Sequence, residues 1–263
     1  MSSGRCLQID FGNSSAKWRL LSQGGDIVTR GRYLPGEEAS RNELLSCSGE
    51  CSKIWVASVA STDTETDFSN LLEKHLGLKP WFARSQKQTG DLVNSYADPA
   101  RMGVDRWLAM LGARKRSQRR VCVVDAGSAL TIDFIAASGH HEGGYIIPGP
   151  ALMERSLLLD TDRVRFEEDA EYALTPGCST AEAVRHGIAL AQVGAVRVAV
   201  DEAQNTPGFG EAPEVFFCGG GAEALAELFG RNNNFAPDLV FEGLQLMSQD
   251  RDAAVGKRAG SDQ

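Results

Sequence analysis

The sequence predicts an α/β protein made of two duplicated halves, each with a mixed sheet. One turn occurs twice, as IDFGNSSAK at residues 9–17 and as VDAGSALT at residues 124–131. Each copy follows a short apolar run and has Asp, then Gly two residues later, then small hydroxyl residues, which is typical of a buried strand entering a tight turn. The expected order of strands and helices also repeats. Two such turns, each opening one half, predict a fold that holds a nucleotide in a cleft between its halves.

The first half is expected to contain five strands and two helices. Gly24 and Gly25 supply a hairpin turn between the second and third strands. Apolar side chains recur at helical spacing through Phe68, Leu71 and Leu72. The expected strands are residues 6–10, 16–21, 26–32, 53–57 and 79–84, and the expected helices are residues 37–47 and 62–75.

The second half repeats this order and adds a long Ala-rich helix. Ser179 is expected to cap that helix, and Glu182, three residues later, to complete a capping box. The GGGA run at residues 219–222 follows a strand and opens a helix, which suits a close approach of the backbone to an adenine or a plain flexible turn. The expected strands are residues 121–126, 129–136, 141–147, 215–218 and 239–242, and the helices are residues 151–159, 180–204 and 222–229.

The segment over residues 96–120 joins the two halves. Its MGVDRW run at residues 102–107 leads into an apolar helix over residues 108–113. We therefore expect an N-terminal domain over residues 1–119 and a C-terminal domain over residues 120–250. The last residues, 251–263, are charged and small, and we expect them to fray.

The composition excludes several classes of partner. Hydrophobic residues make up 42% of the chain, which is enough for a large core. The 27 basic and 35 acidic residues leave a net charge of −8, which argues against a general nucleic-acid binder and against a protein that binds anionic membranes. The basic cluster at residues 114–120 suits the C-terminal end of a helix.

The location in the cell is expected to be the cytoplasm. No apolar run approaches the roughly 18 residues of a membrane span, and the N-terminus lacks the apolar region of a signal peptide. Disulfides are therefore not expected among the six cysteines. Cys6, Cys122 and Cys218 lie in strand-like runs and are expected to be buried thiols. Cys47, Cys51 and the four histidines lack the spacing of a zinc site, and His140 and His141 are placed in a turn.

The repeated turns carry the residue types that phosphate chemistry uses. Glycine lets a backbone approach a ligand closely, and hydroxyl and N–H groups can hold phosphate oxygens. An Asp carboxylate can hold a divalent cation. Asp-x-Gly is common in loops, so a single copy could be a plain β-turn; the second copy favours the functional interpretation.

Four motifs in order resemble those of the type III pantothenate kinases, a family of the superfamily that unites acetate and sugar kinases, chaperone ATPases and actin. They are D-x-G-N-S-x-x-K at residues 10–17, G-x-D-R at residues 103–106, D-x-G-S-A-x-T at residues 125–131 and G-G-x-I-x-P-G at residues 143–149. The resemblance covers residues 6–245. Ser14 and Ser128 stand where many members carry Thr, and both keep the hydroxyl.

The resemblance implies two actin-like (ribonuclease H-like) domains and the ATP-dependent phosphorylation of pantothenate to 4′-phosphopantothenate, the first step of coenzyme A synthesis. It also implies Mg²⁺, a monovalent cation (K⁺ or NH₄⁺) and a homodimer. The positions that match ATP-binding residues are Asp10, Phe11, Gly12, Asn13, Ser14, Ser15, Ala16, Lys17 and Ser128. The positions that match pantothenate-binding residues are Tyr96, Gly103, Val104, Asp105, Arg106 and Thr180.

Three aspartates receive different roles from this resemblance. Asp10 is expected to hold Mg²⁺ on the ATP phosphates and Asp125 the monovalent cation. Asp105 is expected to be the catalytic base, which need only orient the hydroxyl and accept its proton late in a loose transition state. Arg106 can pair with an anion, either the pantothenate carboxylate or a phosphate. From the residues alone, Asp105 and Arg106 could also be ordinary polar residues at a helix N-terminus.

Two alternatives remain open. One is a kinase of the same fold that uses another small hydroxylated acceptor. The other is a non-catalytic nucleotide-binding regulator, such as a transcriptional accessory protein. Asp10, Asp105 and Asp125 argue against the regulator, because a binding module needs no carboxylate at an acceptor.

Overall fold

A computed structural model describes residues 4–12, 15–47, 51–167, 169–205 and 211–259. The chain forms two compact units. The first unit contains Met1–Thr89, Tyr96–Gly112 and Val240–Gln263, and the second contains Gly90–Ser95 and Ala113–Leu239. This division differs from a single boundary near residue 119, because residues 90–95 already belong to the second unit and residues 240–263 belong again to the first unit.

Each unit is built on a five-stranded mixed sheet with the same strand order. The orders are β3-β2-β1-β4-β5 in the first unit and β10-β9-β8-β11-β12 in the second. The first sheet contains β1 (Arg5–Phe11), β2 (Ala16–Leu21), β3 (Ile27–Tyr33), β4 (Cys51–Ser58) and β5 (Trp81–Phe82). The second contains β8 (Val121–Ala126), β9 (Ala129–Ile135), β10 (His141–Pro148), β11 (Glu214–Cys218) and β12 (Asn234–Phe235).

The pairing of the strands is duplicated as well. In each sheet the first strand of the half pairs antiparallel with the next strand, β1 with β2 and β8 with β9. It pairs parallel on its other side, β1 with β4 and β8 with β11. The predicted α/β class with two duplicated mixed sheets is therefore confirmed.

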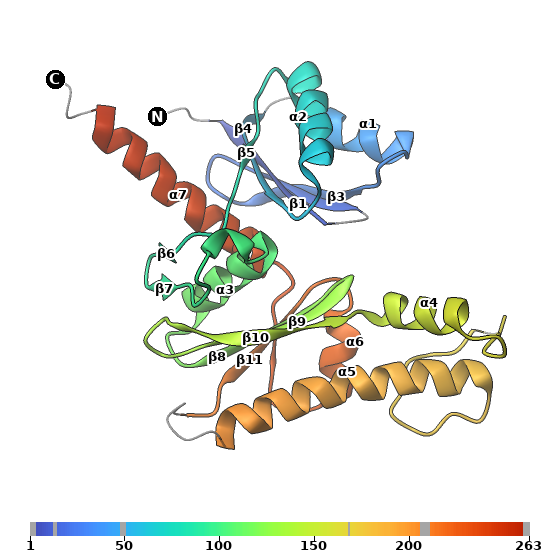
Figure 1. Cartoon of the computed structure of the whole chain (residues 1–263). Coiled ribbons are helices and arrows are strands. Elements are labelled where there is room, and N and C mark those ends of the chain that lie inside the picture. The colour runs from blue at the N-terminus through green and yellow to red at the C-terminus, as the bar shows by residue number, and fades with distance from the viewer. Residues whose placement is uncertain (1–3, 13–14, 48–50, 168, 206–210, 260–263) are drawn as a thin grey trace. The chain divides into compact units, whose positions relative to one another are not determined.

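The first core lies between one face of its sheet and two helices, α1 (Glu38–Cys47) and α2 (Thr62–Leu76), which cover that face in Figure 1. Alternate residues of β1, namely Leu7, Ile9 and Phe11, point into this core. Ser61 caps α2 by accepting a hydrogen bond from the Thr64 N–H. The intervening β1 residues, among them Asp10, therefore face the opposite side of the sheet.

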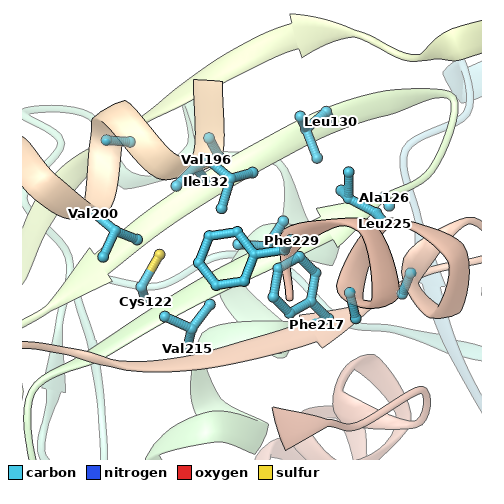
Figure 2. Packing of buried hydrophobic residues seen from close by; sticks show 14 of the residues in the cluster. Cys122, Ala126, Leu130, Ile132, Val196, Val200, Val215, Phe217, Leu225 and Phe229 are labelled. Carbon is cyan, nitrogen blue, oxygen red and sulfur yellow. The ribbon is translucent and has the colours of Figure 1, made fainter. Parts of the chain in front are cut away.

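The second core has the same construction. The helices α5 (Thr180–Asn205) and α6 (Ala222–Phe229) pack on one face of the second sheet. Figure 2 shows the side chains that fill this layer, and the rings of Phe217 and Phe229 lie 5.4 Å apart between their centroids. Cys122, Val124 and Ala126 belong to this core, so Asp125 faces the other side of its sheet, as Asp10 does in the first unit.

The C-terminal region differs from the prediction. Residues 239–242, predicted as a strand, begin a helix, α7 (Leu239–Ala259), which also includes most of the stretch expected to fray. A short apolar run fits a strand or a helix equally well. Val240, Leu244 and Met247 are all buried. Their spacing of four and three residues is helical, but it becomes visible only when residues after 242 are included.

Several smaller differences concern the middle of the chain. The helix predicted over residues 108–113 is longer and begins before Asp105, as α3 (Val104–Arg116). Cys6, Cys122 and Cys218 are buried, as predicted. Elements absent from the prediction are β6 (Gln88–Thr89), β7 (Leu92–Val93), the 3-10 turn η1 (Pro99–Arg101) and, nearer the C-terminus, β12. The predicted helix after residue 150 is α4 (Pro150–Asp160).

One helix among the described residues, α5, is long and apolar enough to cross a membrane by length and composition alone. Its apolar stretch is 39% buried inside the protein. Val193, Val196 and Val200 of this helix pack in the second core, as expected of a core helix.

Candidate active site

The first repeated turn joins β1 to β2. The Gly12 N–H donates to the Ser15 carbonyl at 3.0 Å, which closes the turn. This glycine N–H is therefore engaged within the turn and is not available for a phosphate. Phe11 and Ala16, on either side, are buried in the core, so their side chains only support the turn. Asn13 and Ser14 lie outside the described residues.

Charged side chains form a row across three strands beside this turn. Asp10 of β1 pairs with Lys17 of β2, and Lys17 pairs with Arg32 of β3. The Arg32 guanidinium donates to the Ser15 hydroxyl oxygen at 3.1 and 3.2 Å. Two cations directly opposite each other are unfavourable unless an anion lies near them. Arg32 was not predicted, because its place beside Lys17 depends on the hairpin register.

A second cluster gathers four of the predicted residues at the start of α3. The buried Arg106 donates from Nη1 to the Tyr96 hydroxyl at 3.0 Å, and its guanidinium carbon lies 5.8 Å from the centre of the Tyr96 ring. Asp105 Oδ1 accepts from the Arg106 N–H at 2.8 Å. A side chain on Gly103 would place its Cβ 2.6 Å from Asp105 Oδ1, so only glycine fits there without a shift.

This cluster has the chemistry of a site for a small anionic alcohol. Asp105 is half-buried in the first turn of α3, where the helix dipole favours its negative charge. The side chain of Val104, the first residue of α3, is buried. A carboxylate can accept a hydroxyl proton, and the guanidinium can pair with an anion.

The second repeated turn joins β8 to β9 and is shorter. The Gly127 N–H donates to the Ala129 carbonyl at 3.0 Å, and Ser128 is exposed at the tip. Asp125 lies opposite Thr131 of β9 and Cys218 of β11. As in the first unit, the glycine N–H closes the turn itself.

Glycines from two distant segments close around this second turn. Gly219 has a φ of +97°, and a Cβ there would lie 2.3 Å from Asp125 Oδ1 and 2.6 Å from the Ala126 carbonyl oxygen. The Gly149 N–H donates to the Ser128 carbonyl at 3.0 Å, and the Gly221 N–H donates to the Ala126 carbonyl at 2.8 Å. Gly149 and Gly221 are the N-caps of α4 and α6, so two helix N-termini adjoin the turn. Helix N-termini favour anions.

Thr180 lies elsewhere on the second unit. It is exposed at the start of α5 and lines an open groove of about 940 Å³ with Met153 and Leu157 of α4. Ser179 accepts a hydrogen bond from the Glu182 N–H at 3.2 Å, as predicted for the cap. The Glu182 carboxylate accepts from the Cys178 N–H at 2.7 Å, one residue before the position expected in a capping box.

The sequence comparisons agree on one family. The family model of type III pantothenate kinases matches residues 6–202. A type III pantothenate kinase from Cellvibrio japonicus is 37% identical over 244 residues, which cover 91% of this chain and 95% of the relative. One from Ectopseudomonas mendocina is 38% identical over 245 residues, with 91% and 97% covered.

Solved structures show the same fold at low identity. A conserved Baf family protein from Campylobacter jejuni aligns with a TM-score of 0.57 and 20% identity, covering 94% of this chain and 99% of that chain. The activator of 2-hydroxyisocaproyl-CoA dehydratase from Clostridium difficile, with bound ADPNP, aligns with a TM-score of 0.53 and 12% identity, with 96% and 97% covered. These structures show the fold, and the extended sequence matches show more: the chain belongs to the type III pantothenate kinase family.

Proposed function

We propose that this kinase transfers the γ-phosphoryl group of ATP to the primary hydroxyl of pantothenate, giving 4′-phosphopantothenate and ADP for coenzyme A synthesis. The observation that carries this proposal is the cluster of Tyr96, Gly103, Asp105 and Arg106 at the start of α3, in a chain of the type III pantothenate kinase family. The cluster supplies a carboxylate for the hydroxyl and a buried cation for an anion in one place.

Asp105 is the proposed catalytic base. The hydroxyl oxygen forms its bond to the γ-phosphorus while the bond to the ADP oxygen breaks, and the hydroxyl proton passes to the Asp105 carboxylate. An ordinary Asp, with a pKa of about 4, is too weak to ionise an alcohol beforehand. In a loose transition state it needs only to orient the hydroxyl and to accept the proton late.

Arg106, Tyr96 and Thr180 are the proposed acceptor-binding residues. Arg106 is 5% exposed, and the hydrogen bond from its guanidinium to the Tyr96 hydroxyl fixes the orientation of this cation. The anion proposed to bind it is the pantothenate carboxylate or a phosphate, since both accept paired hydrogen bonds. Gly103 leaves room beside Asp105 for the reacting hydroxyl.

The proposed binding site for the ATP phosphates contains Ser15, Lys17 and Arg32. Phosphate would neutralise the positive charges of Lys17 on β2 and Arg32 on β3, which lie opposite each other. Ser128, exposed next to two helix N-termini, is proposed as a further ATP contact. The half-buried Asp10 carboxylate suits Mg²⁺, which prefers oxygen ligands and would neutralise phosphate charge when bound. Asp10 holds that metal directly or through water.

Asp125 is proposed to hold the monovalent cation. Its Oδ1 atom and the Ala126 carbonyl oxygen converge on the small space that a Cβ of Gly219 would fill. Oxygen ligands of this kind suit hard cations, and the cation would add positive charge near the phosphates when bound.

A homodimer is also part of the proposal. Apolar side chains are exposed on neighbouring elements of the second unit, and this much exposed apolar surface favours association. The most exposed of them are Ile146 (64%) on β10, Leu159 (66%) on α4, and Leu190 and Val198 (61% each) on α5. The groove that includes Thr180 lies between α4 and α5, the two helices that carry Leu159 and Leu190.

An assay of ADP release with pantothenate as acceptor tests the proposed function. Turnover should require ATP, pantothenate and Mg²⁺ together. ADP release with another small alcohol but not with pantothenate would favour a kinase for a different acceptor. ATP binding by calorimetry without turnover on any acceptor would favour the non-catalytic regulator.

A further inference from the structure

Three hydrogen-bonded side chains of the second unit, two of them fully buried, form a chain outside the proposed site. His141 Nε2 lies 3.0 Å from Asp133 Oδ1, and His141 Nδ1 lies 2.8 Å from the Ser95 hydroxyl oxygen. Asp133 and His141 are 1% and 0% exposed, whereas Ser95 is exposed. Two fully buried polar side chains thus end on one hydroxyl at the surface.

The direction of the hydrogen bond between His141 and Asp133 follows from the carboxylate. A carboxylate only accepts, so His141 donates from Nε2 to Asp133, and its Nδ1 atom shares the second hydrogen bond with the Ser95 hydroxyl. The pKa of the neighbouring Cys122 thiol is raised, first by burial and then by the negative charge of Asp133. The Asp133 carboxylate and the Ser95 hydroxyl together give both ring nitrogens of His141 a hydrogen-bond partner.

The second sheet builds this chain from adjacent strands. Asp133 lies on β9 and His141 is the first residue of β10, so the histidine placed in a turn by the sequence is a buried strand residue. The register of β9 and β10 shifts between His141 and Gly143, as in a bulge, and bulges redirect side chains. The neighbours of Asp133 in sequence, Ile132 and Phe134, point into the hydrophobic core, so Asp133 lies on the opposite face.

The segment Gly90–Ser95 is fastened to the second unit at three places. Arg114 pairs with the Asp91 carboxylate and also donates to the Ala137 carbonyl at 3.2 Å. The Val93 N–H donates to the Gly139 carbonyl at 2.9 Å. Ser95, bonded to His141, is the last of these anchors, and the next residue along the chain is Tyr96.

We propose that Asp133, His141 and Ser95 are positioning residues that fix Tyr96, and through it Arg106, for binding of the acceptor. Ser95 holds the backbone on the N-terminal side of Tyr96, and Arg106 holds its hydroxyl at 3.0 Å. A tyrosine anchored at both ends loses less conformational freedom when the acceptor binds. This inference rests on the proposed function, which places Tyr96 and Arg106 at the acceptor.

A serine nucleophile is the competing interpretation, because hydrolases use the same three residue types. The ring nitrogens here have the opposite assignment, with Asp at Nε2 and Ser at Nδ1. The histidine ring is also 0% exposed, which keeps it from donating a proton to a leaving group. The geometry therefore favours a structural hydrogen bond between Ser95 and His141 over attack by the Ser95 hydroxyl.

The main experiment compares Ser95→Ala with the wild-type full-length chain. Loss of this one hydrogen bond should raise the KM for pantothenate about fivefold and leave the KM for ATP unchanged. His141→Asn should act in the same direction, and His140→Asn, at the exposed neighbouring position, should change neither value. If Ser95 acts through Tyr96, the effects of Ser95→Ala and Tyr96→Phe on the pantothenate KM should not add in the double variant.

Equal shifts of both KM values, or additive effects in the double variant, would overturn the inference. If the wild type hydrolyses p-nitrophenyl acetate and Ser95→Ala does not, Ser95 is a nucleophile and the positioning role is wrong. Hydrogen exchange gives a readout that does not depend on turnover, because Ser95→Ala should speed exchange in a peptide spanning residues 92–102. Faster exchange in a protein that does not phosphorylate pantothenate would leave the positioning of Tyr96 intact and would refute only the proposed reaction.

Discussion

Asp105 combines an observed hydrogen bond with a proposed catalytic role, and a single substitution separates the two. Its Oδ1 atom accepts from the Arg106 N–H at 2.8 Å, which stabilises the first turn of α3. An Asn side chain keeps an oxygen for that bond but cannot accept the acceptor's proton. Asp105→Asn should therefore fold like the wild type while its kcat falls by roughly 10²- to 10⁴-fold. Steady-state kinetics with a thermal melt of the same sample measure both, and near-wild-type turnover would refute the assignment.

Gly219 is the residue on which the proposed cation site depends. Alanine at φ +97° is strained, and its Cβ would lie 2.3 Å from Asp125 Oδ1, so the carboxylate must move. We expect wild-type turnover to be faster in K⁺ than in Na⁺, and Gly219→Ala to lose that difference. Both are read from ADP release in matched chloride buffers.

Gly36→Ala is the matched control for Gly219→Ala. Gly36 has a φ of +89°, but no atom lies within 4 Å of the position of its Cβ. Gly36→Ala should therefore show the effect of backbone strain alone, and its turnover should remain faster in K⁺ than in Na⁺. Equal rates in Na⁺ and K⁺ for the wild type would contradict the role of Asp125.

At the scale of elements, the crossing of α3 and α7 depends on one glycine. A Cβ on Gly243 of α7 would lie 2.0 Å from the backbone carbonyl oxygen of Leu108 in α3. Gly243→Ala should therefore separate the helices and lower the free energy of unfolding by about 1–3 kcal/mol. Gly194→Ala, in the interior of α5 with no atom within 4 Å, should instead be neutral or raise it by up to about 1 kcal/mol. Urea unfolding of both variants measures the contrast, and equal midpoints would show that the crossing tolerates a side chain.

The elements with strong local patterns were predictable, and those fixed by tertiary contacts were not. The strand at Ala16–Leu21 and the helix at Ala222–Phe229 match their predicted bounds, because turn residues and apolar spacing mark both ends. The start of α7 was misassigned, because the three apolar residues 239–241 are too few to show a period. Within the site, the motifs pointed to Asp10, Asp105 and Asp125.

Other parts of the site required the register and the backbone angles. Arg32 reaches the first turn through the pairing of β2 with β3, and Gly219 reaches Asp125 through a positive φ. Neither is visible in residue spacing. The same limit applies to His141, whose burial follows from the bulge in β10.

At the scale of the whole molecule, the exposed apolar surface of the second unit predicts the oligomeric state. Leu190 is 61% exposed on α5, and we expect it to lie in the homodimer interface. A glutamate in that interface would have to lose its hydration, so Leu190→Glu should not associate. By light scattering, this variant should have the mass of one chain and the wild type the mass of two chains. Val28→Glu on β3, where Val28 is 48% exposed, is the matched control and should remain a dimer. A monomeric wild type would refute the interface.

The return of α7 to the first unit sets an order for folding during synthesis. The first unit starts the chain, yet Phe241 and Leu244, which it buries, come after every other element. Arg19 of β2, 5% exposed, stacks on the Phe241 ring with its guanidinium carbon 4.7 Å from the ring centre. On the ribosome this arginine stays without that ring until residue 241 has emerged. The unit translated first is therefore completed last, and the newly made chain must keep part of its first sheet uncovered while the second unit forms.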